Sequence, residues 1–155
     1  MGMASRNIKK KFNPNYTPIG WREWVYLPKY KNFPIKAKID TGATSSALNA
    51  YDIKIYKKGK QSWVSFKLKQ NKRVLKINSK LIKQKKITNS FGDTEIRPVI
   101  IMKIKLGHQS WDTEVTLAMR SSMTYPMLVG RSSLKKKHII HSHKSYLTGK
   151  HSILL

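Results

Sequence analysis

The sequence predicts an all-β fold, either a closed barrel or a sandwich, in a chain of 155 residues that has the size of one domain. Short segments in which apolar and polar residues alternate recur along the chain, and turn-forming residues separate them. Helical periodicity is scarce by comparison. Because each such strand buries mainly one face, the strands must close on one another or pack in two layers.

The expected elements follow a basic, polar arm. Residues 1–18 hold little apolar material, so we expect a flexible arm there and one β domain over residues 19–155. Within that domain, alternation and apolar runs predict strands over residues 21–27, 33–39, 62–68, 74–77, 81–87, 96–106 and 111–117. Residues 131–134, directly after Gly130, are the best candidate for one short helix near the C-terminus.

The charge balance is unusual, with 32 Lys and Arg against 7 Asp and Glu and a formal net charge of +25. This excess favours anionic partners, although the lysines are spread along the whole chain, as in a generally lysine-rich surface. The absence of cysteine excludes disulfides and thiolate metal sites. No apolar run approaches the about 20 residues of a membrane span. No signal-peptide core is seen, which favours a cytoplasmic location; a periplasmic or secreted one would follow if a signal peptide had been removed.

Asp40 is the acidic residue that stands out. It ends an apolar strand and precedes Thr41, Gly42 and Ala43, where the backbone can turn sharply and approach a substrate. A carboxylate that emerges from a buried strand is costly unless it is paired or used, and an Asx turn that closes the strand is the structural alternative. The remaining acids occupy ordinary polar positions of strands or turns, or flank a hairpin tip: Glu23, Asp52, Asp112 and Glu114, and then Asp93 and Glu95.

Three landmarks, in this order, resemble those of retropepsins, the single-motif viral-type aspartic proteases. Asp40-Thr41-Gly42-Ala43 resembles the catalytic motif, residues 88–93 resemble a flap hairpin, and residues 126–134 (PMLVGRSSL) resemble the closing element with its Gly-Arg pair. A narrower resemblance, to a bacterial retropepsin-like family, covers nearly all of the chain after the arm. It rests on residues 19–28 (IGWREWVYLP), 36–43 (KAKIDTGA), 46–48 (SAL), 95–100 (EIRPVI) and 125–131 (YPMLVGR).

That family is commonly labelled ATP-dependent zinc proteases, and its genes often accompany ATP-grasp ligases that add glutamates to proteins. The resemblance implies a small closed β-barrel of the retropepsin type and an aspartic-type endopeptidase. It also implies a homodimer, because one motif supplies only half of a catalytic pair and a two-fold axis would bring Asp40 to its own copy. The paired carboxylates would share a proton and act as general base and general acid on a water and a peptide carbonyl.

The resemblance also assigns supporting roles. Thr41 would brace the two loops across the axis, Gly42 would offer its backbone to substrate, and Ala43 completes the active-site loop. Ser90, Phe91 and Gly92 would form the flap that closes over the substrate. Arg131, after Gly130, would support the loop from below. Thr44 stands where viral retropepsins carry an acidic partner for that arginine, so Arg131 needs another acceptor.

We expect no cofactor and no metal. The chain has no Gly-rich phosphate loop with Lys-Ser/Thr and no His-Glu-x-x-His motif. The best metal candidates, His138, His141 and His143, lack a supporting carboxylate because no acidic residue follows Glu114. Surface histidines near a basic C-terminus are the simpler interpretation.

The expected partners are a second copy of the chain and an acidic or glutamate-modified protein segment as substrate. The +25 charge and the association with glutamate ligases both favour such a substrate. The alternative is a basic β-barrel that binds RNA or an acidic protein without catalysis, with Trp63, Phe66 or Tyr51 as stacking surfaces. Nucleic acid is the less favoured partner, because no motif clusters these aromatic residues and burial in strands is a simpler account of them. A protease fold that has lost catalysis and only binds is a further alternative.

Overall fold

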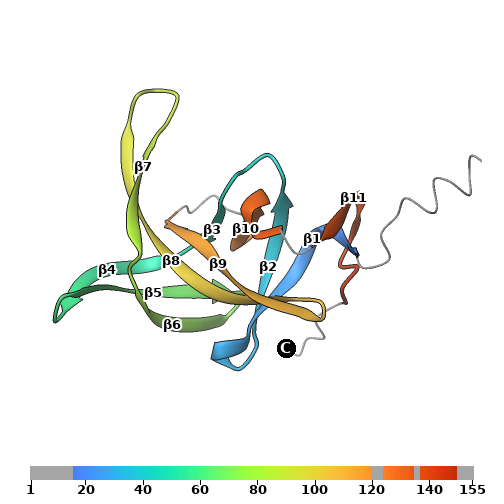
Figure 1. The fold of residues 1–155 in the computed structure, drawn as a ribbon, viewed down its shortest axis with the longest axis horizontal. Coiled ribbons are helices and arrows are strands. Elements are labelled where there is room, and N and C mark those ends of the chain that lie inside the picture. Colours follow the sequence, from blue (N-terminus) through green and yellow to red (C-terminus); the bar gives the residue numbers. More distant parts are fainter. Residues whose placement is uncertain (1–15, 120–123, 135–136, 150–155) are drawn as a thin grey trace, which may run out of the picture.

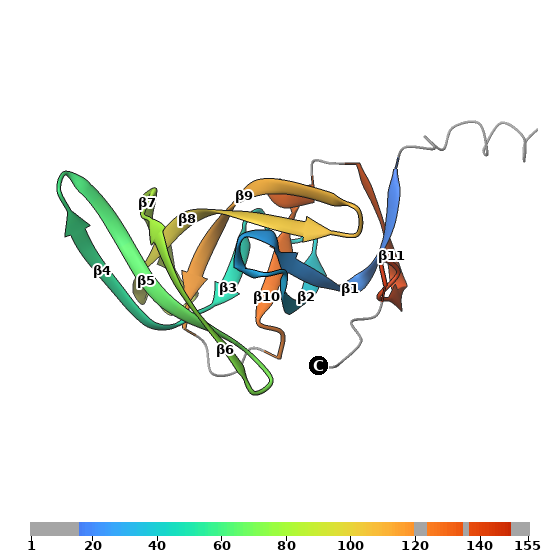
Figure 2. The ribbon, with the colours of Figure 1, turned by 90° about the horizontal axis from the view of Figure 1, so that it is seen from below.

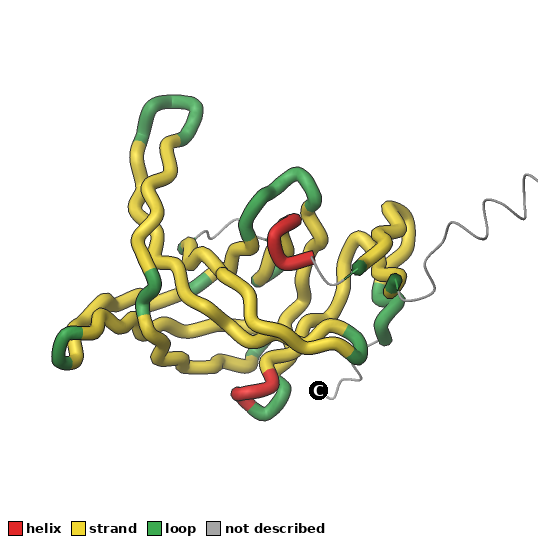
Figure 3. The backbone as a smooth tube through the Cα atoms, in the orientation of Figure 1, coloured by secondary structure: helices red, strands yellow, loops and turns green. Residues whose placement is uncertain are grey.

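The computed structural model describes residues 16–119, 124–134 and 137–149. They form β-strands and two single turns of 3-10 helix, η1 (Pro28–Tyr30) and η2 (Arg131–Leu134), as Figure 3 shows. The all-β prediction is confirmed. The short helix that we expected after Gly130 is a 3-10 turn of four residues. The division into an arm (1–18) and a domain (19–155) stays a prediction, since residues 1–15 lie outside the described residues.

Eight strands form one mixed sheet that closes into a barrel (Figure 1). Its strand order is β11 (His138–Ser145), β1 (Thr17–Leu27), β2 (Phe33–Asp40), β10 (Met127–Gly130), β3 (Ser46–Asn49), β9 (Gln109–Ala118), β8 (Thr94–Leu106) and β7 (Lys83–Thr88). Pairing of Tyr26 on β1 with Lys105 on β8 closes the ring over β1, β2, β10, β3, β9 and β8. The closed barrel that the retropepsin resemblance implied is therefore present.

The core lies inside this barrel. In each strand where apolar and polar residues alternate, the residues that point into the barrel are almost completely shielded from solvent, as we expected from the alternation. Each large apolar side chain buried in this way contributes about 1.5–3 kcal/mol relative to an exposed one. The fully shielded members with no measurable exposure are Ile19, Val25, Leu27, Ala37, Leu48, Ile104, Leu106, Val115, Leu117, Met127 and Val129.

A second, three-stranded antiparallel sheet packs beside the barrel (Figure 2). It consists of β4 (Tyr51–Lys58), β5 (Gln61–Gln70) and β6 (Arg73–Lys80) in chain order. One face of this sheet joins the core through Val64, Phe66, Leu68 and Ile77, each at most 1% exposed. Phe66 is therefore not available as a stacking surface.

Glu23 holds Leu147 and Thr148 against β1. Its side chain is fully buried, which contradicts our interpretation of it as an ordinary polar strand residue. The carboxylate accepts hydrogen bonds from the backbone N–H groups of Gly20 (2.6 Å), Leu147 (2.8 Å) and Thr148 (3.1 Å). The Thr148 hydroxyl donates a fourth bond at 2.6 Å. A buried carboxylate is tolerated here because donors surround it.

No helix among the described residues is long and apolar enough to cross a membrane.

Candidate active site

Asp40 is the last residue of β2, where it pairs with Gly130 of the parallel strand β10. The Gly42 N–H donates to Asp40 Oδ1 at 3.0 Å, and the Ala43 N–H donates to the Asp40 carbonyl oxygen at 3.2 Å. The Asx-type turn that we considered as an alternative is thus present. It does not bury the carboxylate, because Asp40 is half-buried while Thr41 and Gly42 are exposed. The turn holds an accessible carboxylate at the end of a rigid strand.

Arg131 braces this loop from behind. Its guanidinium donates to the Thr41 carbonyl oxygen at 2.7 Å and to the Thr44 hydroxyl at 3.2 Å. Backbone bonds continue the contact, from Arg131 N–H to Ala43 O (2.8 Å) and from Ser132 N–H to Thr44 O (2.9 Å). Viral retropepsins carry an acidic partner for this arginine where Thr44 stands here. In this chain the Thr41 carbonyl oxygen and the Thr44 hydroxyl accept the hydrogen bonds of Arg131 instead.

Gly130 lies so close to the loop that any larger residue would force the loop backbone to shift. A Cβ atom at this position would lie 2.5 Å from the backbone carbon and oxygen of Ser45 and 3.0 Å from the Ala43 carbonyl oxygen. Those atoms belong to backbone and cannot rotate away. In the Gly-Arg pair, Gly130 allows the close approach to the loop backbone, and the Arg131 side chain donates hydrogen bonds to the loop.

A chain of buried hydroxyl groups, which we did not predict from the sequence, supports the loop from inside the barrel. The Gly130 N–H donates to Ser46 Oγ at 3.0 Å, Ser46 Oγ lies 2.5 Å from Ser133 Oγ, and Ser133 Oγ lies 2.6 Å from Thr113 Oγ1. The three hydroxyls come from β3, η2 and β9, so they tie these elements together beneath Asp40. Isolated Ser and Thr residues carry too weak a signal to predict such a chain.

The candidate flap is the hairpin of β7 and β8, which Thr88 and Thr94 close. Asn89 shapes its tip: the side-chain oxygen accepts the N–H groups of Phe91 (2.9 Å) and Asp93 (3.0 Å). Gly92 takes a φ of 85°, which favours glycine. Ser90, Phe91 and Gly92 thus lie at the tip of a hairpin, and their role as a flap stays a prediction. Figure 1 shows the hairpin rising on the same side of the barrel as the loop after β2 and standing apart from it.

Phe91 at this tip is 90% exposed, and Ile96 further down the hairpin is 62% exposed. An exposed phenylalanine contributes nothing to the core. The tip is therefore free to contact another molecule or to close over the loop.

A basic cavity of about 310 Å³ lies between the base of β7 and the active-site loop. Its lining combines lysines of β7 with residues of the loop and of strands β8 and β9: Ser45, Lys83, Gln84, Lys85, Lys86, Val99, Glu114 and Thr116. Lys85 Nζ lies 3.4 Å from Ser45 Oγ, and Lys83 pairs with Glu114 at 3.6 Å. The sequence contains so many lysines that we could not predict from it that Lys83, Lys85 and Lys86 line a cavity.

The histidines of β11 do not fit a zinc site. Among the described residues, no group of three or more His, Asp or Glu side chains is placed to hold a metal ion. His138 packs its ring against Trp111, with 5.4 Å between the ring centroids, and burial lowers its pKa. These surroundings are those of a packed side chain.

The fold and the Asp40 loop define a retropepsin-like aspartic protease domain. Residues 18–151 match the RimB-like family, described as retropepsin-like aspartic endopeptidase RimB. The chain belongs to this family. The resemblance stated from the sequence is confirmed at the level of the family and its barrel.

Curated proteins similar to this chain are considerably longer than it. The chain is 38% identical over 135 residues to a protein of Shewanella pealeana named "Probable alpha-L-glutamate ligase", covering 84% of this chain and 30% of that protein. A protein of the same name from Parasynechococcus marenigrum is 35% identical over 135 residues, covering 84% and 29%. The chain therefore spans about 30% of the length of these relatives.

A solved structure shares the fold. The crystal structure of a Legionella pneumophila protein of unknown function superimposes with a TM-score of 0.72 over 85% of this chain and 98% of that one, at 24% sequence identity.

Proposed function

We propose that this protein is an aspartic endopeptidase that works as a homodimer, with the Asp40 carboxylates of two chains acting on one water molecule. The observation that carries the proposal is the position of Asp40 at the end of β2, accessible on a loop that Gly130 and Arg131 hold from behind. One chain supplies one such carboxylate, and a copy related by a two-fold axis supplies the second.

The chemistry follows from placing two carboxyl groups in contact. They cannot both ionise, so they share one proton. The ionised group accepts a proton from water as the water oxygen attacks the carbonyl carbon of the scissile peptide bond. The protonated group donates its proton to the carbonyl oxygen, which gives a tetrahedral diol. Transfer of a proton to the amide nitrogen then breaks the carbon–nitrogen bond and releases two peptides.

Residues around Asp40 take supporting roles in this proposal. Thr41 is exposed beside the carboxylate and contacts its copy across the axis. The Gly42 N–H already donates to Asp40, so we assign substrate contact to the Gly42 carbonyl oxygen. Closure of the flap brings the exposed Phe91 over the bound chain and excludes water from the bond that is cut.

The substrate that fits the surroundings is an acidic protein segment. The cavity beside the loop has Lys85 and Lys86 in its lining, and its Glu114 is already paired with Lys83. A chain bearing carboxylates would therefore meet the ammonium groups of Lys85 and Lys86 beside Ser45, in the loop that follows Asp40. The net charge of +25 would speed the encounter with such a chain.

The relatives favour glutamate as the acidic residue. Proteins that contain a region similar to this chain are named "Probable alpha-L-glutamate ligase". A peptidase domain joined to, or working beside, an enzyme that handles glutamate would act on glutamate-rich segments.

The test compares cleavage of three matched peptides, rich in glutamate, glutamine or lysine, by the wild type and by Asp40→Asn in buffer that contains EDTA. The proposal predicts fastest cleavage of the glutamate peptide, loss of all cleavage in the variant, and no effect of the chelator. Equal rates for the three peptides would overturn the substrate class. Activity that EDTA abolishes and zinc restores would overturn the mechanism. A domain that only binds would cleave none of the peptides.

A further inference from the structure

The three-stranded sheet has an outer face that the peptidase does not use. Strand pairing places residues in rows across β4, β5 and β6, and alternate rows face the core or the solvent. Val64, Phe66 and Ile77 face the core. Their neighbours in sequence therefore share the opposite face, which carries Tyr51, Lys54, Tyr56, Lys58, Trp63, Ser65, Lys67, Lys69, Lys76, Asn78 and Lys80.

This outer face is strongly basic. It carries six lysines, and among the described residues the carboxylate paired with one of them is that of Asp52, which lies 3.1 Å from Lys67 Nζ. A hollow of about 280 Å³ opens on the face between Lys54, Lys67 and Lys76, and its lining also includes Asp52, Ser65 and Phe66. Unlike lysines scattered over a convex surface, these converge on a concave site.

Aromatic rings alternate with these lysines. Tyr56 is paired with Trp63 across β4 and β5 and is 39% exposed. Lys58 Nζ lies 5.9 Å from the centre of the Trp63 ring, and Lys69 Nζ lies 4.3 Å from that of Tyr51. The sequence suggested Trp63 and Tyr51 as stacking surfaces but could not place them together. The register of the sheet does so and adds Tyr56.

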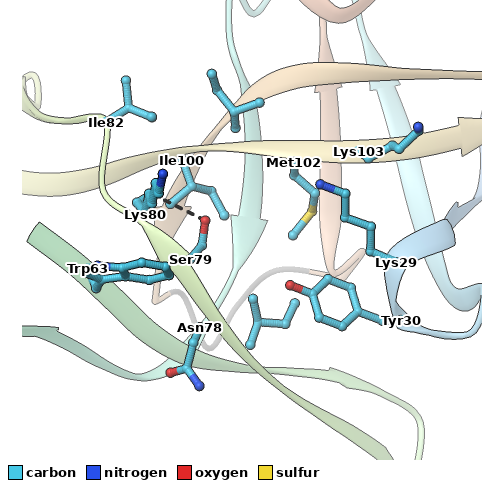
Figure 4. A pocket seen from close by; sticks show the side chains of 12 residues that line it. Lys29, Tyr30, Trp63, Asn78, Ser79, Lys80, Ile82, Ile100, Met102 and Lys103 are labelled. Carbon is cyan, nitrogen blue, oxygen red and sulfur yellow. Dashed lines mark hydrogen bonds between the residues drawn. The ribbon is translucent and has the colours of Figure 1, made fainter. Parts of the chain in front are cut away.

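The surface continues around the edge of β6 into a cavity of about 370 Å³ between this sheet and the barrel. Figure 4 shows Trp63 and Tyr30 on opposite sides of this cavity, with Lys29 and Lys80 near its rim. Its floor includes the buried side chains of Ile77, Ile100 and Met102. An apolar floor beside the ring of Tyr30, with cationic groups at the rim, suits a flat ring that carries a negative charge nearby.

We propose that this outer face binds single-stranded RNA. Lysines arranged around exposed aromatic rings match the two needs of a single strand, which are neutralised phosphates and stacked bases. An acidic peptide would use the lysines but has no need of Tyr56 or Trp63, so the rings favour RNA over peptide. The face lies on β4, β5 and β6, whereas the Asp40 loop lies between β2 and β3, so the proposal does not depend on the peptidase (Figures 1 and 2).

The experiment measures binding of a fluorescein-labelled 12-nucleotide RNA of mixed sequence by fluorescence anisotropy over a range of salt concentrations, with an unlabelled glutamate 12-mer peptide as competitor. Lys54→Gln/Lys76→Gln removes two charges from the hollow. It should weaken binding and reduce the slope of log affinity against log salt by about 1.4. Tyr56→Thr removes an exposed ring from a strand while keeping β propensity. It should weaken binding about fivefold or more at an unchanged salt slope, whereas Tyr56→Phe should bind like the wild type.

The matched control is Lys137→Gln/Lys144→Gln, which removes the same charge from exposed residues at the far edge of the barrel. It should leave most of the affinity in place. Asp40→Asn should bind RNA like the wild type, which separates this site from the catalytic one.

An equal loss in the control and in Lys54→Gln/Lys76→Gln would overturn the proposal in favour of general charge attraction. A Tyr56→Thr variant that stays folded by circular dichroism and binds RNA like the wild type would overturn it as well. The proposal would also be overturned if the glutamate peptide displaced the labelled RNA as well as unlabelled RNA does, when both competitors are compared at equal concentrations of negative charge. The face would then be a site for acidic protein.

Discussion

The guanidinium of Arg131 donates to the carbonyl oxygen of Thr41 at 2.7 Å, although the two residues are 90 positions apart in the chain. This bond, with the one to the Thr44 hydroxyl, joins η2 to the loop that carries Asp40. It fixes the backbone next to the carboxylate without touching the carboxylate itself. Arg131 is in this sense a positioning residue.

Arg131→Lys should lower activity while the protein remains folded. Lysine keeps the charge but cannot form the planar fork that reaches both Thr41 and Thr44. We expect a fall in kcat/KM of about tenfold and a loss of about 1 kcal/mol in the free energy of unfolding. Peptide cleavage and urea denaturation measure the two quantities. Arg73→Lys, at an exposed arginine of β6 whose guanidinium lies 5.1 Å from the centre of the Phe33 ring, is the control; it should leave kcat/KM unchanged and cost at most about 1 kcal/mol. Wild-type kcat/KM in Arg131→Lys would show that the fork is dispensable.

Gly130→Ala should destabilise the protein strongly. The added Cβ would lie 2.5 Å from the Ser45 backbone, so the loop must shift. We expect a loss of about 2–3 kcal/mol, measured by thermal and urea denaturation. Gly59→Ala is the comparison: its φ is 65°, but no atom lies within 4 Å of the added Cβ. That change should cost only about 1 kcal/mol, which is the penalty for placing a residue with a Cβ atom in the left-handed backbone region. Equal costs for the two substitutions would argue against the close approach.

Glu23→Gln tests the buried carboxylate beneath the C-terminal segment. Four donors face the two oxygens of Glu23, and an amide group would turn a donor toward at least one of them. We expect a loss of about 2–4 kcal/mol in the free energy of unfolding. Glu114→Gln removes an exposed carboxylate that lies 3.6 Å from Lys83, and it should cost less than about 1 kcal/mol. A Glu23→Gln protein as stable as Glu114→Gln would contradict this account.

Phe91→Ser tests the flap. The ring is 90% exposed, so its loss should leave the melting temperature within about 2 °C of the wild type. If the tip closes over substrate, kcat/KM should fall by about tenfold or more, because the ring would lose its contact with the bound chain. Ile101→Ser, at a residue of β8 that is 50% exposed, offers a matched surface control. Unchanged kcat/KM in Phe91→Ser would remove the tip from the mechanism.

The sequence predicted those strands whose apolar residues alternate. Strands β2 and β9 place every second residue in the core, and both were recognised from that pattern. Strand β4 is exposed along nearly its whole length, so it carries no such alternation and was missed. Strand β10 is only four residues long and was recognised as a family landmark without being assigned as a strand.

The parts of the site that depend on register could not be predicted. Asp40, Gly130 and Arg131 came from a motif, but the hydroxyl chain of Ser46, Ser133 and Thr113 joins three elements whose alignment only the fold determines. The burial of Glu23 depends in the same way on residues 124 and 125 positions away. The grouping of Tyr56 with Trp63 likewise required the pairing of β4 with β5.

The central claim is that two Asp40 carboxylates act together, and a mixing experiment tests it most directly. Wild-type protein at fixed concentration is allowed to exchange subunits with an equal amount of Asp40→Asn before cleavage of the glutamate peptide is measured. If both carboxylates are required, mixed dimers are inactive and random pairing lowers the rate to about half. A rate that stays at the wild-type value despite demonstrated subunit exchange, or cleavage by Asp40→Asn alone at the wild-type rate, would contradict the account.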